Sequence, residues 1–326
     1  MEPLRIVAIG GGTGLSTLLH GLKQFAPNEA DITAVVTVTD DGGSSGRLRR
    51  EFDVLPPGDI RNCMVALSED EALLSKLFQY RFAEGRGLKG HSFGNLFLTA
   101  LTNLTGDFSK AVAMSSEILA SRGRIFPSTA QNVVLEAEFE DGTIVSGETR
   151  ISKSSRRIRR LRLVPASCKP VPETLSAIEA ADLITFGPGS LFTSVIPNVL
   201  VHGIPAAIKR SRALKAYFVN LMWQPGETIG FTASDHVAAI HEHADSNLLD
   251  VVIINKEPIR PAQRRKYATE AAKPVANDTA KLEALGVEVV SADLLAEGTI
   301  VRHNSIAAAA IAMKLARRGR ERRLAA

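Results

Sequence analysis

The segment ITAVVTVTDDGGSSGRLRREFDVLPPGDIRN, residues 32–62, joins an uncharged run to a polar, glycine-rich loop. Its first eight residues are rich in valine, isoleucine and threonine, as in a buried strand of a parallel sheet. The next two residues, Asp40 and Asp41, therefore lie at the carboxyl end of a strand. Ligands bind at that edge of open α/β sheets, because the loops there carry polar groups on a rigid support. The segment predicts an α/β fold with a binding site at this edge.

The loop after these two acids supplies glycines and small hydroxyl groups. Gly43, with Gly42 and Gly46, lets the backbone take positive φ angles or approach a ligand closely. Ser44 and Ser45 offer hydrogen bonds beside it. A flexible Gly/Ser turn is the alternative interpretation, although such a turn does not require two adjacent acids.

A second turn, LPPGDIRN at residues 55–62, ends the segment. Its prolines restrict the backbone, and a helix is expected from residue 60 onward. Asp59 and Asn62 are candidate ligand contacts at the start of that helix. Asp59 could instead be only the helix N-cap, since aspartate is common at that position.

The amino-terminal residues repeat the strand, loop and helix pattern. Residues 4–9 predict a strand, GGGTG follows at 10–14, and residues 15–25 predict a helix. Free N–H groups and the helix dipole at such a turn favour a phosphate, whereas close packing of strand on helix would also explain the glycines. The strict dinucleotide fingerprint is absent, because its third glycine would fall at Leu15. The candidate phosphate contacts are Gly10, Gly11, Gly12, Thr13 and Gly14.

Three more polar segments precede expected helices. They are GHSFGN at residues 90–95, FGPGSLFTS at 186–194, and VRHNS at 301–305, which precedes a helix expected at 306–315. Side chains there could contact an anion or a sugar hydroxyl at a helix N-terminus. Helix caps, a structural histidine and an exposed arginine are the alternatives. The candidates are His91, Ser92, Asn95, Gly187, Gly189, Ser190, Thr193 and Arg302.

The alternation of strands and helices predicts a mostly parallel sheet with helices on both faces. Later strands are expected at residues 182–186, 217–222, 249–255 and 287–290. Runs at 133–139, 144–150 and 158–164 predict a hairpin and a third strand, which form a small β-rich insertion at about residues 130–165. We expect one α/β domain over residues 1–316 and a basic tail at 317–326.

Composition and charge narrow the class of protein. The chain has 326 residues, of which 45% are hydrophobic, so it can bury a large core. No apolar run reaches the ~20 residues that cross a bilayer, and the first residues do not resemble a signal peptide. Cys63 and Cys168 fit no metal-ligand spacing and suit a reducing compartment. A cytoplasmic protein without a membrane span is expected.

Nucleic-acid binding and two kinds of catalytic site are disfavoured. The net charge of +4 comes from basic segments at 153–162 and 317–323, and acidic residues outnumber basic ones elsewhere. One tryptophan and three tyrosines offer little for base stacking. We expect residues 156–162, within the first basic segment, to be an exposed, charged sheet edge. No G-x-S-x-G motif is present, and His241 and His243 would point apart on a helix, which disfavours a zinc pair.

Together, these motifs resemble one family. GGGTG, DDGGSSGRLR, LPPGDIRN, GHSFGN, FGPGSLFTS and QPGET at 224–228 are similar to motifs of the bacterial gluconeogenesis factors (YvcK-like), in the superfamily of 2-phospho-L-lactate transferase (CofD-like). The resemblance covers the chain to about Leu315. It implies a Rossmann-like, cytosolic protein that binds UDP-sugars, notably UDP-N-acetylglucosamine. It also implies support of cell shape and wall synthesis during growth on gluconeogenic carbon sources.

The resemblance implies roles for individual residues as well. Residues 10–14 would hold phosphate, Asp40 and Asp41 would face the nucleotide or a metal ion, and Asn95 and the 187–194 loop would line the same cleft. No cofactor is certain, but the transferase relatives use magnesium, which Asp40, Asp41 and Asp59 could hold. Because DDGGSSG is typical of the gluconeogenesis factors, we expect a binding regulator, with a magnesium-dependent transferase as the alternative. A homo-oligomer is compatible with both.

Overall fold

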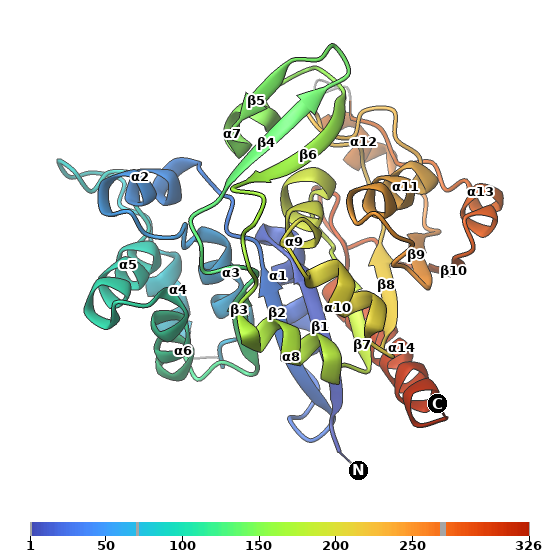
Figure 1. Ribbon diagram of the computed structural model, residues 1–326, viewed down its shortest axis with the longest axis horizontal. Helices are drawn as coiled ribbons and strands as arrows, with labels where there is room; N and C mark the ends of the chain where they lie inside the picture. Colours follow the sequence, from blue (N-terminus) through green and yellow to red (C-terminus); the bar gives the residue numbers. More distant parts are fainter. Residues whose placement is uncertain (1, 70–71, 268–271, 326) are drawn as a thin grey trace.

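The computed structural model describes residues 2–69, 72–267 and 272–325. A seven-stranded parallel sheet lies at its centre, in the order β10-β9-β8-β7-β1-β2-β3 (Figure 1). The strands are β1 (Leu4–Gly10), β2 (Ala30–Val36), β3 (Arg124–Pro127), β7 (Leu183–Phe186), β8 (Leu214–Phe218), β9 (Val251–Asn255) and β10 (Glu288–Ala292). The expected Rossmann-like architecture is confirmed.

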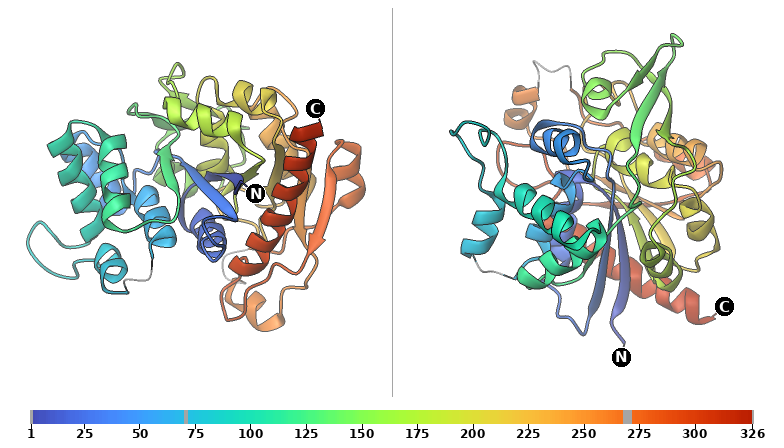
Figure 2. Two further views of the ribbon diagram at one scale, coloured as in Figure 1. Left: turned by 90° about the horizontal axis from the view of Figure 1, so that it is seen from below. Right: turned by 60° about the vertical axis from the view of Figure 1, so that its left-hand side comes forward.

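Helices cover both faces of this sheet (Figures 1 and 2). One face carries α1 (Gly12–Leu22), α3 (Gly58–Leu67) and α14 (Ser305–Ala325), and the other carries α8 (Pro172–Ala180), α9 (Ile196–Val199) and α10 (Ile204–Arg210). The aliphatic strand residues between them, such as Ile9, Val35 and Ile184, are fully buried. Their burial stabilises the sheet by about 25 cal/mol for each Å² of apolar surface removed from water.

A helical segment connects β2 to β3 and lies beside the sheet (Figure 1). In addition to α3 it contains α2 (Gly43–Phe52), α4 (Ala72–Gln79), α5 (Phe93–Thr105) and α6 (Phe108–Ile118). Phe78, Phe93 and Phe97 are in mutual ring contact between α4 and α5. The opposite end of the sheet, formed by β8 to β10, has three more helices beside it (Figure 1). These are α11 (Ala233–His243), α12 (Pro261–Tyr267) and α13 (Thr279–Ala284).

The β-rich insertion is a separate three-stranded antiparallel sheet in the order β5-β4-β6. It consists of β4 (Val134–Phe139), β5 (Ile144–Ser146) and β6 (Ile158–Val164). The strand expected to continue to residue 150 ends earlier, and residues 148–152 form the short helix α7 (Glu148–Ser152) instead. The cause is Gly147, whose φ of 99° turns the chain away from the sheet.

Arginines of β6 and of the turn before it form a charged edge, as expected. Each is paired with a carboxylate: Arg156 with Asp141, Arg157 with Glu140, Arg159 with Glu138, Arg160 with Asp245, and Arg162 with Glu136. These pairs leave little unbalanced positive charge on the insertion.

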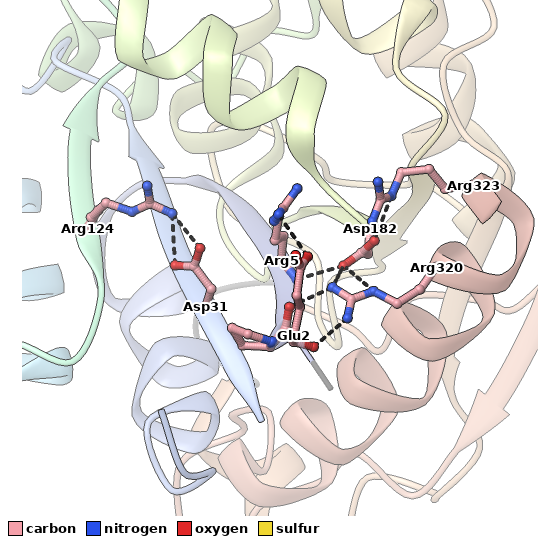
Figure 3. A network of polar contacts seen from close by, with 8 residues as sticks. Glu2, Arg5, Asp31, Arg124, Asp182, Arg320 and Arg323 are labelled. Atoms are coloured by element: carbon pink, nitrogen blue, oxygen red, sulfur yellow. Dashed lines mark hydrogen bonds and ion pairs between the residues drawn. The ribbon is translucent and has the colours of Figure 1, made fainter. Parts of the chain in front are cut away.

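The basic C-terminal segment is helical and is held against the body of the protein, which differs from the expected tail. Arg320 and Arg323 both donate to the carboxylate of Asp182, which is fully buried before β7 (Figure 3). Arg320 also donates to the carbonyl groups of Glu2 and Pro3. A buried carboxylate requires such partners. Burial favours the neutral form, but the hydrogen bonds from Arg320 and Arg323 prevail and lower the pKa of Asp182.

Cys63 and Cys168 are both buried free thiols. Among the helices that the structure describes, none is by itself both long and apolar enough to cross a membrane.

Candidate functional site

The strand order reverses between β1 and β7, because the chain continues from β1 toward β3 on one side and from β7 toward β10 on the other. In open α/β sheets, the crevice at the carboxyl ends of two such strands is the usual ligand site. A cavity of about 570 Å³ lies at this point, between the loops after β1 and β7. Its volume falls within the ~300–1,000 Å³ of small-molecule sites.

The loop after β1 presents the start of α1 to the cavity. Gly12 begins the helix with a φ of 62°. The N-cap position before it is Gly11, which has no side chain to cap the helix. Gly14 must be glycine, because a Cβ there would lie 2.5 Å from the carbonyl oxygen of Pro188 in the opposite loop. A helix start that its own N-cap residue leaves uncapped can, together with the helix dipole, receive an anion such as phosphate.

Asp59 lies opposite this loop. Its carboxylate accepts a hydrogen bond from the N–H of Gly12. Desolvation, followed by the charge of Asp40, raises the pKa of Asp59 to about 7. The helix α3 begins after Pro57 without a side-chain cap, so Asp59 is not the N-cap of its own helix. Asp59 instead joins α3 to the glycine loop.

Glu227 holds the loop after β7 in place. This buried carboxyl group accepts hydrogen bonds from the N–H of Phe192 (3.0 Å) and the hydroxyl of Thr193 (2.9 Å). Burial raises its pKa. Gln224 Nε2 donates to Ser190 Oγ at 2.7 Å. The loop after β8, which contains QPGET, therefore fixes the geometry of the loop that carries Ser190 and Thr193.

The β-rich insertion contributes Glu148, from α7, to the cavity lining. Its Oε2 accepts a hydrogen bond from Thr39 Oγ1 at 3.0 Å. Burial, followed by the charges of Asp59 and Asp40, raises the pKa of Glu148 well above its ordinary value. Asp59, Glu148 and Glu227 are thus all shifted toward their neutral forms. They repel an anionic ligand less than three ordinary carboxylates would.

A second group of predicted residues lies outside the cavity lining and bonds largely within itself. Ser44 Oγ and His91 Nδ1 are 3.0 Å apart, and Asn95 Nδ2 lies 3.4 Å from Ser45 Oγ. Arg61 donates to both Ser92 and Asn62. Desolvation lowers the pKa of His91, which favours the neutral imidazole. These buried contacts join α2 and α3 to the start of α5.

Asp40 and Asp41 are also absent from the cavity lining. Asp40 Oδ1 accepts from the N–H of Gly42 at 2.9 Å, and Asp41 Oδ1 accepts from the N–H of Thr149 at 2.8 Å. Within residues 2–69, 72–267 and 272–325, no group of three or more His, Cys, Asp and Glu side chains is arranged to hold a metal ion. The geometry therefore does not assemble the magnesium trio of Asp40, Asp41 and Asp59. Asp59 alone of the three borders the cavity.

The structure thus divides the predicted residues into two sets. Those that line the cavity are Gly11, Gly12, Thr13, Gly14, Asp59, Gly189, Ser190, Thr193 and Arg302. Those outside the lining are Gly10, Asp40, Asp41, Gly43, Ser44, Ser45, Asn62, His91, Ser92, Asn95 and Gly187. Lining residues that carried no prediction include Glu148, Asn220, Trp223, Gln224 and Glu227. For Gln224 and Glu227 the QPGET motif was a signal, whereas Glu148 was concealed within an expected strand.

Known proteins match this chain over most of its length. The model of the family "CofD: 2-phospho-L-lactate transferase CofD" matches residues 6–295. The gluconeogenesis factor of Halalkalibacterium halodurans is 51% identical over 306 residues, 94% of each chain. That of Bacillus subtilis is 47% identical over 312 residues, 95% of this chain and 98% of the relative.

A solved structure agrees with these matches. A crystal structure described as a protein member of the upf0052 family from Bacillus halodurans is 50% identical to this chain, with a TM-score of 0.92. The match covers 97% of this chain and 99% of the solved one. Family model, relatives and solved structure all span most of the sequence, and the chain therefore belongs to the CofD family, with close similarity to its members named gluconeogenesis factor.

Proposed function

We propose that the protein binds a UDP-sugar, with UDP-N-acetylglucosamine as the first candidate, and acts as a cytoplasmic gluconeogenesis factor. In this role it would regulate cell shape and wall synthesis during growth on gluconeogenic carbon sources. The observation that carries the proposal is the start of α1, which its own N-cap residue does not cap and which borders a cavity at the reversal of the sheet. The name of the similar proteins, gluconeogenesis factor, supports the part of this role that concerns gluconeogenic growth.

The cavity lining combines polar and apolar groups, which favours a nucleotide over a simple anion. The glycine loop provides N–H donors for a pyrophosphate, and the exposed side chain of Arg302 lies on the same lining. Leu221, Met222 and Val301 also line the cavity and belong to a small apolar cluster separate from the main core. A planar base can pack on such a surface, with Trp223 beside it.

The fluorescence of Trp223 provides a direct test, because it is the only tryptophan of the chain and borders the cavity. Titration with UDP-N-acetylglucosamine should change the emission in a saturable way, and GDP-sugars should have a weaker effect. Failure of every UDP-sugar to change the emission or to compete with another nucleotide would argue against the proposal.

A magnesium-dependent transferase is the second candidate, favoured by the description of the matching family and by the position of Asp59. Magnesium is commonly bound by one or two carboxylates together with substrate phosphates, so Asp59 fits a shared site with a nucleotide ligand. This candidate predicts turnover of a phosphorus-containing substrate that requires magnesium and is abolished by Asp59→Asn. If candidate substrates remain unchanged at high protein concentration, the transferase candidate is rejected and only the proposal of UDP-sugar binding remains.

A further inference from the structure

The helix α7 is capped by a residue from a distant part of the chain. Its own N-cap position is Gly147, which has no side chain to accept a hydrogen bond. Asp41 fills that role, because its carboxylate accepts from the N–H of Thr149, the second residue of the helix, and from the Thr149 hydroxyl. The two residues are 108 positions apart in the sequence. The cap therefore joins the insertion to the loop after β2.

Two more contacts fix the position of α7. Thr39 Oγ1 donates to Glu148 Oε2, next to the cap. At the other end, the carbonyl oxygen of Ser152 packs so closely on Gly226 that a Cβ there would lie 2.0 Å away. A helix of five residues is too short to be stable alone. Its position therefore depends on these contacts with the body of the protein.

The result is a carboxyl group presented to the cavity by the insertion. Glu148 borders the cavity, and one of its two oxygens, Oε1, has no hydrogen-bond partner within the described part of the chain. The charged groups that act on it are Asp59, Asp40 and Glu227. Glu148 therefore belongs to the polar part of the lining and is not a member of the apolar cluster that contains Leu221 and Met222.

We propose that Asp41 is a positioning residue, which caps α7 and thereby holds Glu148 where its free oxygen contacts a hydroxyl group of the sugar in the bound nucleotide sugar. A carboxyl group pairs with a hydroxyl in either protonation state, since it can accept a hydrogen bond or donate one. An ionised phosphate oxygen, in contrast, only accepts hydrogen bonds, so it could pair with Glu148 only when the carboxyl group is protonated. The identity of the ligand rests on the proposed function, whereas the role of Asp41 as a cap does not.

Binding measurements test both parts of this assignment. Glu148→Ala should weaken UDP-N-acetylglucosamine about tenfold and leave UDP nearly unchanged, because UDP lacks the sugar hydroxyls. Asp41→Ala should produce the same loss, and the double variant should lose no more than either single variant. Asp41→Asn should retain most of the affinity, because asparagine is also a good N-cap. The matched control is Glu138→Gln, which alters an exposed carboxylate of the same insertion.

The opposite results would overturn the assignment. If Asp41 contacted the ligand or its metal ion through charge, Asp41→Asn would lose as much affinity as Asp41→Ala, and the effects of the two sites would add. Equal losses for UDP and UDP-N-acetylglucosamine in Glu148→Ala would place Glu148 on the nucleotide instead of the sugar.

Hydrogen exchange of the ligand-free protein tests the cap separately from the proposed function. Asp41→Ala should speed exchange of the α7 amides by about fivefold, the effect of a lost N-cap. Thr149→Val is a second variant that removes only the hydroxyl contact and should act in the same direction. Asp107→Ala removes a comparable cap from α6 and should leave α7 unchanged. If exchange of α7 were the same in wild type and Asp41→Ala, the cap would have no positioning role, whatever the ligand is.

Discussion

The carboxylate of Asp59 accepts a hydrogen bond from the N–H of Gly12, which joins the first turn of α3 to the first turn of α1 beside the cavity. The pKa of this carboxyl group rises from an ordinary value of 3.8 to about 7, mainly through desolvation. Between these two values the folded protein binds more protons than the unfolded chain. The free energy of unfolding therefore decreases as the pH rises through this interval.

Asp59→Asn should reduce this pH dependence, because asparagine fills the same space and does not titrate. Urea unfolding at about pH 4.5 and about pH 7.5 should show a smaller loss of stability in the variant than in the wild type. Asp107→Asn, at the exposed N-cap of α6, serves as the control. An equal decrease in wild type and Asp59→Asn would mean that Asp59 does not hold the extra proton.

The pairing of Asp182 with α14 should make a large contribution to stability. Arg320→Ala should lower the free energy of unfolding by about 3 kcal/mol, because it leaves a fully buried carboxylate with one fewer partner. Arg318→Ala breaks an exposed pair with Glu288 on the same helix and should cost less than about 1 kcal/mol. Equal effects of the two substitutions in chemical denaturation would show that Asp182 does not depend on Arg320.

Gly14 and Gly10 offer a matched test of the glycine loop. In Gly14→Ala the new methyl group would collide with Pro188, whereas at Gly10 it would make an ordinary contact of 3.4 Å with Leu15. Gly14→Ala should therefore separate the two loops, cost about 1–3 kcal/mol of stability and weaken nucleotide-sugar binding. Gly10→Ala should alter both quantities much less. Similar affinities for the two variants would indicate that close packing of the loops is not required for binding.

The sheet and its switch point were predictable from local patterns. Predominantly aliphatic runs at 4–9, 32–39 and 182–186 are each followed by a glycine-containing polar loop, and parallel strands bring those ends to one edge. Glycine loops were therefore expected at the site, and two of them line the cavity.

Residues whose roles depend on distant partners were not predictable. Glu148 lies in a segment with the composition of a strand, and only the backbone turn at Gly147 makes it helical. Asp41 follows a strand at the expected edge, but its partner, Thr149, comes from the insertion. The arginines of α14 resembled a solvated tail because their counter-charge, Asp182, lies at the start of a strand 138 residues earlier than Arg320. Sequence spacing contains no information on such pairings.

Calorimetric titration of the wild-type protein with UDP-N-acetylglucosamine, in parallel with Gly14→Ala, tests the central claim most directly. If the cavity at the reversal of the sheet binds nucleotide sugars, the wild type should give saturable heat with one ligand per chain. The variant should bind at least tenfold more weakly, a loss of about 1.4 kcal/mol or more in binding free energy. The absence of binding in the wild type, or equal affinity in the two proteins, would contradict the claim.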